Sequence, residues 1–452
     1  MAMQLIIKDG NENLTSHSGL ALIGTLLART NLKERLNALH LYGCGAPKIS
    51  HADILLSMIG LLCLGKPDYD AIEQFRNDSF FMQSLGLKAC PSSPALRQRI
   101  DMVKDAVDAI IKEESSELIR RIAPRISSLS TSIGEYVPLD LDVSPFDNSK
   151  TQKEGVSRTY KGVDGYSPNF SYLGREGFLI NVELREGSQH CQKGTPEFLK
   201  ESIFYVKRIT SQKLLVRMDS GNDSTDNRKV LNAEENVDFI IKRNPRKEDP
   251  KAWLQLAKEM GEKQTPREGK TIWCGKTHMD IKGNPLSTPI VFEVIERTIN
   301  KHNEYLIFPE IEVNTYWVTL DVSANDAIWL YQDHGTSEQF HSEIKSDMGL
   351  ERLPSKYFKS NALILLLGML AYNMLKLCGQ ESLREDNGNI ERIPGLRKKV
   401  KRRRIRTIIQ DLIYMAGRII HTGRRWCISF GRTNPFRDLW KSIYQRFAIR
   451  AV

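Results

Sequence analysis

The order of strands and helices between residues 131 and 243 constrains the fold more than any other feature of the sequence. One segment there, TPEFLKESIFYVKRI (195–209), begins with Thr-Pro and carries apolar residues at helical spacing. Other segments read as strands: EYVPLDLDV (135–143), NFSYL (169–173), GFLINVEL (177–184), KLLVRMD (213–219) and FIIKR (239–243). Strands in this succession, with a helix and a helix-like segment between them, predict a mixed α/β sheet covered by helices.

The regions on either side of this sheet differ in character. Residues 1–130 carry apolar residues at helical spacing and are expected to be mainly helical. A polar stretch, 244–312, has no clean periodicity until TPIVFEVIERTI, and we interpret it as an insertion. The sheet pattern resumes in TYWVTLDV (315–322). The sequence therefore predicts an N-terminal helical region at 1–130, an α/β domain at 131–375 and a basic helical region at 376–452.

The cysteines and the longest apolar run indicate in which cellular compartment the protein is expected to work. The seven cysteines are scattered and form no Cys-x2-Cys pair, which favours a reducing compartment without disulfides or a zinc site. No signal peptide is recognisable at the start, so a cytoplasmic protein is expected. The longest apolar run, 361–378, contains Asn361, Asn373 and Lys376 and is short for a bilayer. We expect it to be a buried helix and expect no membrane partner.

Positive charge is concentrated at the C-terminus. The net charge is +10, yet the segment from Arg392 onward holds 17 Lys and Arg residues against only Asp411 and Asp438. A segment with so large an excess of positive charge is suited to bind a polyanion. Nucleic acid is the first candidate partner, and an anionic membrane is the second. A merely solvated tail is the alternative, but apolar residues thread through the segment, as in a helix that packs on something.

Carboxylates close two of the predicted strands. Asp140 and Asp142 share one face of their strand because side chains alternate, and Asp219 ends another strand. Ligand sites in α/β sheets gather at the carboxyl ends of strands, so these acids are expected to meet. Each acid alone also fits an ordinary turn, but two carboxylates on one strand face are costly unless a cation or hydrogen-bond donors compensate.

A titratable stripe follows in YQDHGTSEQFHSEIK (331–345). Tyr331, His334, Glu338, His341 and Lys345 recur at helical spacing, and a plain solvated helix face is the alternative explanation. If Glu338 joins the strand acids, three carboxylates converge in an oxygen-rich site that suits Mg2+ or Mn2+. Two such ions about 3.5–4 Å apart form a clamp for in-line attack on a phosphodiester.

These blocks resemble a known family. The spacing Tyr331-x2-His334-x3-Glu338-x6-Lys345 is similar to the Tyr-x2-Arg-x3-Glu-x6-Lys signature of the Asp-Asp-Glu (DDE) transposases of bacterial insertion sequences. LDLDVSPFDNS and KLLVRMDSGN resemble the family's first and second Asp blocks, and SNALILLLGMLAYNMLKL resembles the segment after its Glu. The ordered set of blocks covers most of the chain.

The resemblance implies an RNase H-like catalytic domain with a β-rich insertion and catalytic Asp142, Asp219 and Glu338. These three, with Asp140, would bind two Mg2+ or Mn2+ ions per active site. Asp142 is preferred over Asp140 because Ser144 follows it as a Ser or Thr usually follows the first Asp, but Asp140 remains an alternative.

One departure from the signature is His334 in place of Arg, because an imidazole holds a phosphate less well than a guanidinium. Either this copy is impaired, or protonated His334 suffices, or Arg217 or Lys345 substitutes for it.

The implied function is cut-and-paste transposition of a mobile element. A homodimer in a paired-end complex would bind terminal inverted repeats and target DNA, cleave the strands and join them, in a bacterial cytoplasm and on the nucleoid. PSSPALRQRI (91–100) could supply a recognition helix, or it could be a plain amphipathic helix with exposed arginines. The expected DNA-contacting residues are Tyr331, His334, Lys345, Arg217, Arg97, Arg99, Lys398, Lys399, Lys401, Arg402, Arg403 and Arg404.

Two alternatives remain open at this point. A metal-dependent endonuclease without strand transfer would use the same carboxylates. A catalytically inactive, transposase-derived DNA-binding protein is the other, although the sequence retains all three candidate acids.

Overall fold

The computed structural model describes residues 5–39, 47–104, 106–123, 126–278, 287–300, 302–384, 400–423 and 425–449. Its contacts divide the chain into two compact units. One unit joins Met1–Pro124 to Glu343–Val452, and the other is Arg125–Ser342. We call them the helical unit and the sheet unit and describe each by itself.

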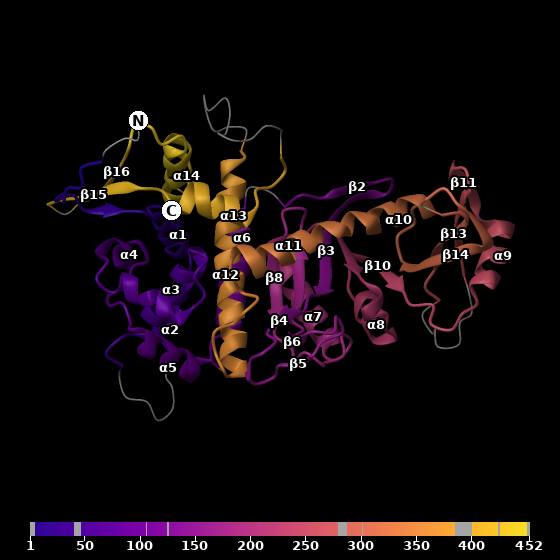
Figure 1. Ribbon diagram of the computed structural model, residues 1–452, viewed down its shortest axis with the longest axis horizontal. Coiled ribbons are helices and arrows are strands. Elements are labelled where there is room, and N and C mark those ends of the chain that lie inside the picture. The colour runs from indigo at the N-terminus through magenta and orange to yellow at the C-terminus, as the bar shows by residue number, and fades with distance from the viewer. Residues whose placement is uncertain are drawn as a thin grey trace. The chain divides into compact units, whose positions relative to one another are not determined.

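The centre of the sheet unit is the predicted mixed α/β sheet (Figure 1). Strand β3 (Gly134–Val143) pairs antiparallel with β7 (Asn169–Leu173), which pairs antiparallel with β8 (Phe178–Glu183). On its other side β3 runs parallel to β9 (Leu214–Met218), and β9 runs parallel to β10 (Val237–Arg243). The carboxyl ends of β3, β9 and β10 therefore meet at one edge of the sheet.

The stretch expected to be an insertion extends this same sheet. Strand β10 pairs antiparallel with β14 (Tyr305–Val318), which is followed in order by β13 (Ile290–Ile299), β12 (Lys270–Thr277) and β11 (Glu262–Arg267). Strand β14 starts ten residues before the strand predicted at 315, because its first half, YLIFPEI, pairs with β13 although it is mostly exposed. Helix α9 (Pro250–Met260) contacts β12, β13 and β14.

Helices follow the strands as predicted. Helix α7 (Thr195–Ile209) lies between β8 and β9 in the chain, and α8 (Thr225–Asn232) begins after an N-cap in which Ser224 accepts a hydrogen bond from the Asn227 amide. Helix α10 (Ala324–Gln332) buries Ile328 and Leu330 in a core shared with β9, β10 and β14. Helix α11 (Ser337–Ser342) continues it after a 3-10 turn.

Three short strands form a separate small sheet directly after β3. Strand β4 (Phe146–Asp147) pairs with β6 (Asp164–Tyr166), and β6 pairs with β5 (Ser157–Arg158). A tight turn joins β5 to β6, in which the Gly162 amide bonds to the Thr159 carbonyl. This small sheet begins three residues after β3 ends, so it is anchored beside the carboxyl end of that strand.

The helical unit is built on α12 (Phe358–Ser382), which contacts α3 (His51–Cys63) and α6 (Asp108–Ile122). Within the described residues α12 alone is long and apolar enough to cross a membrane, and 94% of its most apolar window is buried inside the protein. The apolar run at 361–378 is thus a buried helix, as the sequence predicted.

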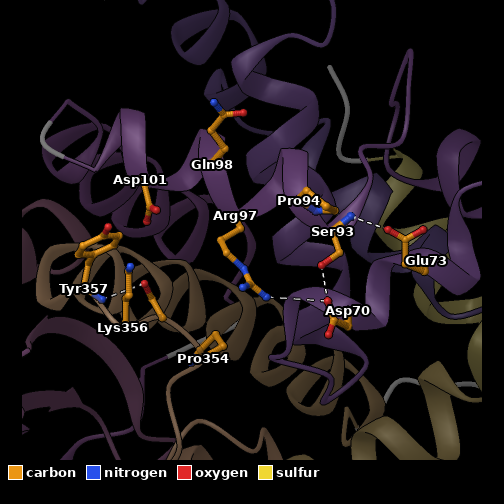
Figure 2. A pocket seen from close by; sticks show the side chains of 11 residues that line it. Asp70, Glu73, Ser93, Pro94, Arg97, Gln98, Asp101, Pro354, Lys356 and Tyr357 are labelled. Atoms are coloured by element: carbon orange, nitrogen blue, oxygen red, sulfur yellow. Dashed lines mark hydrogen bonds and ion pairs between the residues drawn. The ribbon is translucent and has the colours of Figure 1, made fainter. Parts of the chain in front are cut away.

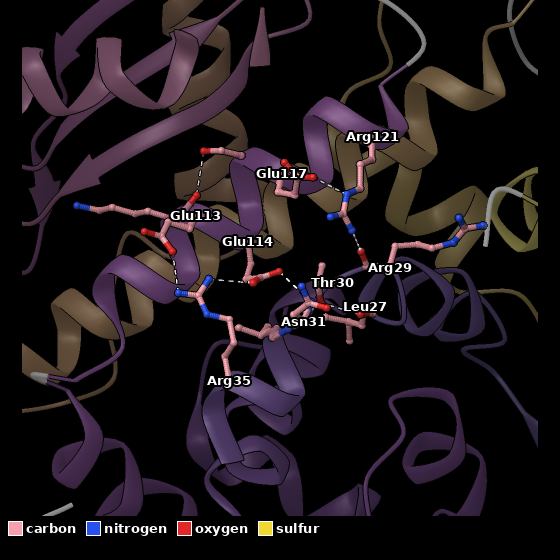
Figure 3. Close-up of polar contacts among 12 residues, drawn as sticks. Leu27, Arg29, Thr30, Asn31, Arg35, Glu113, Glu114, Glu117 and Arg121 are labelled. Carbon is pink, nitrogen blue, oxygen red and sulfur yellow. Dashed lines mark hydrogen bonds and ion pairs between the residues drawn. The ribbon is translucent and has the colours of Figure 1, made fainter. Parts of the chain in front are cut away.

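Polar contacts tie the N-terminal helices together (Figure 3). From α2 (Leu32–Asn37), Arg35 forms ion pairs with Glu113 at 2.7 Å and Glu114 at 2.9 Å on α6. Arg121, also on α6, donates to the Arg29 carbonyl at 3.0 Å, just after α1 (Leu20–Leu27). These contacts hold α6 against the first two helices.

The C-terminal segment departs from the helical region expected for it. Helices α13 (Ile405–Ile408) and α14 (Arg437–Ile449) flank a hairpin of β15 (Gly417–Thr422) and β16 (Arg425–Phe430). The runs RIIHT and RWCISF are rich in residues that favour strands, and Gly423 at φ +58° supplies the turn. Strand β1 (Leu14–Thr15) pairs with β15.

Candidate active site

Asp142 and Asp219 leave neighbouring strands at the same level of the sheet. The parallel register of β3 and β9 pairs Asp140 with Arg217 and Leu141 with Met218. The next residue on each strand is Asp142 and Asp219, and neighbouring strands lie only about 4.8 Å apart. Side chains alternate, so both carboxylates lie on the face where Asp140 and Arg217 meet. The two acids predicted to meet are thus on adjacent strand ends.

The two carboxylates influence each other electrostatically. Burial and the charge of Asp142 together raise the pKa of Asp219, although a hydrogen bond from Asn222 at 2.8 Å opposes that rise. Burial also acts to raise the pKa of Asp142, but the hydrogen bond from His341 and the electrostatic influence of His341 and His334 lower it on balance. One member of the pair is stabilised in its charged form and the other is not.

Asp140 has a different partner. Arg217 donates from Nε to Asp140 Oδ1 at 2.6 Å and from Nη2 to Oδ2 at 2.8 Å, and Arg217 is only 1% exposed. The same guanidinium donates to the Leu330 carbonyl at 2.7 Å and to Asp333 at 3.2 Å. The expectation that Arg217 contacts DNA is corrected, because its side chain is buried and bonded within the sheet unit. Asp140 pairs with a cation of the protein itself.

Helices α10 and α11 lie across this face of the sheet. Arg217 reaches the end of α10 through Leu330, and from α11 the His341 Nε2 lies 3.1 Å from Asp142 Oδ2. His334, in the turn between the two helices, is buried beside Tyr331 with 5.8 Å between ring centroids. Its Nε2 is a buried atom without a hydrogen-bond partner among the described residues. The electrostatic influence of both histidines lowers the pKa of Asp142.

Glu338 lies one helical turn from each of these histidines. His334 precedes it by four residues in the 3-10 turn, and His341 follows it by three residues in α11. Both histidines are buried. Glu338 is exposed. Among the residues that the structure describes, no group of three or more His, Cys, Asp or Glu side chains is arranged to hold a metal ion. The structure brings Asp142 and Asp219 together and leaves Glu338 outside their immediate group.

Tyrosines border the acids as well. Burial, followed by the charges of Asp219 and Asp142, raises the pKa of Tyr331 well above its ordinary value. In the β5–β6 turn, Tyr160 donates its hydroxyl to the Val143 carbonyl at 3.3 Å, and burial of that hydroxyl with the charges of Asp142 and Asp219 raises its pKa to about 12. Sequence reasoning did not select Tyr160, because no periodic pattern marks a turn residue.

The pair fits a divalent cation by its chemistry. Two partly buried carboxylates lie side by side, and no ion pair with a Lys or Arg of the described residues joins either of them, whereas Asp140 has Arg217. Carboxylate oxygens are the ligands that Mg2+ and Mn2+ prefer. The raised pKa of Asp219 shows that its charged form is disfavoured by burial and by the charge of Asp142. A bound cation would stabilise that charged form.

The arginines of the N-terminal region lie in the helical unit and already have contacts. Helix α5 (Ser93–Val103) starts after an N-cap at Ser92 and carries both Arg97 and Arg99. Arg97 stacks over the Tyr69 ring and lies 3.9 Å from Asp70, while Arg99 lies 2.7 Å from a ring nitrogen of His51. Figure 2 shows Arg97 in a pocket that also presents Asp70, Glu73, Asp101 and Lys356. With three acids against two cations, this pocket does not resemble a phosphate site.

Much of the predicted basic DNA-binding segment is ion-paired within the helical unit. Arg402 bonds to Glu343 at 2.5 Å, Arg404 bonds to Asp347 at 2.7 and 3.0 Å, and buried Arg403 bonds to Asp411. Lys401 is exposed, and Lys345 is partly buried in the π-helix η4 (Glu343–Asp347) of the same unit. Lys398 and Lys399 lie outside the described residues. Arg402, Arg403 and Arg404 thus have acidic partners within the unit, and their contact with DNA stays a prediction.

Comparisons with known proteins bear on identity. No curated protein matches the sequence. Among solved structures, a cryo-EM structure of the piggyBac transposase synaptic complex with hairpin DNA matches at 10% identity and a TM-score of 0.38, covering 80% of this chain and 75% of that chain. A family model described as transposase DDE domain group 1 matches residues 4–450. The chain therefore belongs to the DDE transposase family.

Proposed function

We propose that this transposase cleaves DNA at the ends of an insertion sequence and joins the freed ends to target DNA. The observation that carries the proposal is the placement of Asp142 and Asp219 on adjacent strand ends beneath a helix that also bears Glu338. The family match supports a DNA-processing transposase. The mixed core of β8, β7, β3, β9 and β10 supports the RNase H-like assignment made from the sequence.

In this proposal Asp142, Asp219 and Glu338 hold divalent ions, Mg2+ or Mn2+. When bound, such ions supply activation of the attacking oxygen and stabilisation of the leaving oxygen. Glu338 is exposed on α11, the helix that also carries His341, and in this proposal its carboxylate turns toward the strand acids. Asp140 serves to hold Arg217 and is not assigned to the metal.

The residues of α10 and the following turn are proposed to hold DNA. The buried Nε2 of His334 has no hydrogen-bond partner among the described residues, and in this proposal DNA binding exposes it so that it donates a hydrogen bond to a phosphate oxygen. This role needs only one donor, so it does not require the Arg of the family signature. Arg217 cannot substitute for that Arg, because it is committed to Asp140 and Asp333.

The remaining expectations are proposed in the same way. The protein acts as a homodimer on two terminal inverted repeats in the cytoplasm, associated with the nucleoid. Sedimentation of the protein with and without end DNA tests the dimer, and a monomer on a single end in both conditions would contradict it.

The central experiment compares wild type with Glu338→Gln, Asp142→Asn and Asp219→Asn on DNA that carries the element's ends. The control is Glu235→Gln, an exposed acid in a loop of the same unit. We expect metal-dependent cleavage and joined products from wild type and the control, and neither from the three variants. Cleavage without joined products would support an endonuclease, and DNA binding without cleavage would support an inactive DNA-binding protein.

A further inference from the structure

Three side chains from three elements form a continuous hydrogen-bonded chain that ends at Asp142. The Tyr172 hydroxyl on β7 lies 3.1 Å from His341 Nδ1, and His341 Nε2 on α11 lies 3.1 Å from Asp142 Oδ2 on β3. Tyr172 is fully buried and His341 nearly so. The three residues are far apart in the sequence, so their contact depends on the fold of the sheet unit.

The identity of the groups sets the direction of the hydrogen bonds. A carboxylate only accepts, so His341 Nε2 carries the proton and donates it to Asp142. In the tautomer that carries its only ring proton on Nε2, Nδ1 is an acceptor, which makes the Tyr172 hydroxyl the donor. Tyr172 thus selects the tautomer of His341 whose Nε2–H faces Asp142.

Packing fixes the plane of the His341 ring. Its centroid lies 5.1 Å from that of Phe170 and 5.3 Å from that of Tyr172, and Tyr172 also packs against Phe340 at 5.1 Å. Aromatic contacts of this kind leave the imidazole little freedom to rotate. The Nε2–H is therefore aimed at Asp142 Oδ2 before any ligand arrives.

We propose that His341 is a positioning residue which, with Tyr172 behind it, orients the Asp142 carboxylate for a divalent cation. Asp142 Oδ1 accepts from the Val143 amide at 2.8 Å and Oδ2 accepts from His341, so both oxygens are fixed while each keeps a further lone pair. Partners that orient a ligating carboxylate commonly contribute 10–100-fold to metal affinity. The inference rests on the proposed function, because it assumes that Asp142 binds the cation.

A purely structural role predicts something different. His17 and Asp78 form a similar buried pair in the helical unit, with His17 Nε2 lying 3.0 Å from Asp78 Oδ2, where Asp78 caps helix α4 (Ser79–Ser84). If His341 only supported the fold, its removal would resemble the removal of His17, with a loss of stability and no specific effect on the cation.

The experiment measures Mn2+ binding to the full-length chain without DNA, by electron paramagnetic resonance of free and bound Mn2+. His341→Phe keeps an aromatic ring and removes the donor, and Tyr172→Phe removes only the hydroxyl. His341→Gln places an amide N–H near the position of the imidazole Nε2. We expect Mn2+ affinity to fall roughly 10–100-fold in His341→Phe, to fall less in Tyr172→Phe, and to be largely restored in His341→Gln. His17→Gln should bind Mn2+ like wild type.

Each other outcome counts against a specific claim. Wild-type affinity in a folded His341→Phe variant would overturn the positioning role. If His341→Phe does not fold, the Mn2+ affinities of Tyr172→Phe and His341→Gln test the positioning role instead. Wild-type affinity in Tyr172→Phe together with a loss of Mn2+ binding in His341→Gln would overturn that role. Asp142→Asn distinguishes failure of the positioning role from failure of the proposed metal site. If Mn2+ binding survives in Asp142→Asn, Asp142 does not bind the cation and the proposed metal site is wrong, whatever the effect of His341.

Discussion

Arg217 holds both oxygens of Asp140, two residues before the level at which Asp142 and Asp219 face each other. The same two strands thus carry a neutralised acid–base pair followed by two acids. This arrangement distinguishes Asp142, the preferred first acid, from Asp140, which had remained an alternative. Asp140 fixes β3 to β9 and, through the bond from Arg217 to Leu330, fixes β9 to α10.

The first prediction concerns that buried pair. Asp140→Asn leaves the Arg217 guanidinium with one fewer charged partner in a site that is 1% exposed, so we expect a loss of about 3–5 kcal/mol in the free energy of unfolding. Urea unfolding followed by circular dichroism measures it. Asp321→Asn, on a fully exposed side chain, is the control. Equal stability of Asp140→Asn and the control would contradict a structural role for the pair.

The second prediction is that replacing Asp219 raises the stability, whereas replacing Asp140 lowers it. Burial and the charge of Asp142 raise the pKa of Asp219, so the ionised carboxylate destabilises the metal-free fold at neutral pH. Asp219→Asn removes that charge, and we expect a gain of roughly 0.5–2 kcal/mol in metal-free buffer together with loss of cleavage. Thermal unfolding in the presence of a chelator measures the gain. A lower melting temperature than wild type would show that the Asp219 charge does not destabilise the fold.

The core strands were predictable because their signals are local. Alternation and turn residues mark β3, β7, β8, β9 and β10, and strand ends placed Asp142 beside Asp219. Predictions of individual contacts failed where the partner is distant in sequence. Arg217 was expected to contact DNA because its partner Asp140 lies 77 residues away in the sequence. The stripe that contains His341 could also be explained as a solvated helix face, because Asp142 lies 199 residues away.

The acidic partners of the C-terminal arginines could not be predicted for the same reason. A run of basic residues predicts an exposed polyanion-binding surface only if no acid of the same chain reaches it. Arg402 and Arg404 pair with Glu343 and Asp347, which lie 59 and 57 residues earlier. The charge run also obscured the hairpin that follows, whose strand-forming residues are interrupted by arginines.

This distinction between paired and exposed arginines gives the third prediction. Arg418 and Arg425 are exposed on the β15–β16 hairpin and form no ion pair within the described residues, whereas Arg402 bonds to buried Glu343. Replacing Arg418 and Arg425 with Ala should lower DNA affinity and reduce the log–log salt slope by about 0.9 for each phosphate that the protein no longer neutralises. Arg402→Ala should instead cost roughly 1–3 kcal/mol of stability.

Fluorescence anisotropy with labelled end DNA over a salt series measures the slopes, and thermal unfolding measures the stabilities. The reverse pattern, with Arg402→Ala changing the salt slope and the hairpin variants leaving it unchanged, would mean that the internal ion pairs open to DNA.

Tyr160 carries the fourth prediction. Its hydroxyl is tied to Val143, one residue after Asp142, while the side chain is 69% exposed on a tight turn with Lys161 over the ring at 5.9 Å. An exposed ring held beside the acids is suited to stack on a base near the cleavage site. Tyr160→Ala should weaken binding of end DNA by about 1–3 kcal/mol, and Tyr160→Phe should weaken it less.

A titration of DNA with 2-aminopurine near the cleavage site reads both affinity and stacking. Tyr305→Ala is the matched control, because Tyr305 is also exposed but lies in the part of β14 that does not pair with β10. If Tyr160→Ala and Tyr305→Ala bind alike, stacking by Tyr160 is excluded.

The last prediction tests how firmly α11 is held in place, since this helix carries both Glu338 and His341. Gly177, in the turn between β7 and β8, has φ +72°, and a Cβ there would lie 2.3 Å from the Phe340 ring. Gly177→Ala therefore strains the turn and pushes Phe340 away, so we expect a loss of roughly 1–3 kcal/mol and reduced cleavage. Gly335, just before α11, has no positive φ, and no atom of the described residues lies within 4 Å of the place that a Cβ would occupy, so Gly335→Ala should be neutral or slightly stabilising. Thermal unfolding and cleavage assays on the two variants decide, and equal behaviour would mean that contact with the β7–β8 turn does not position α11.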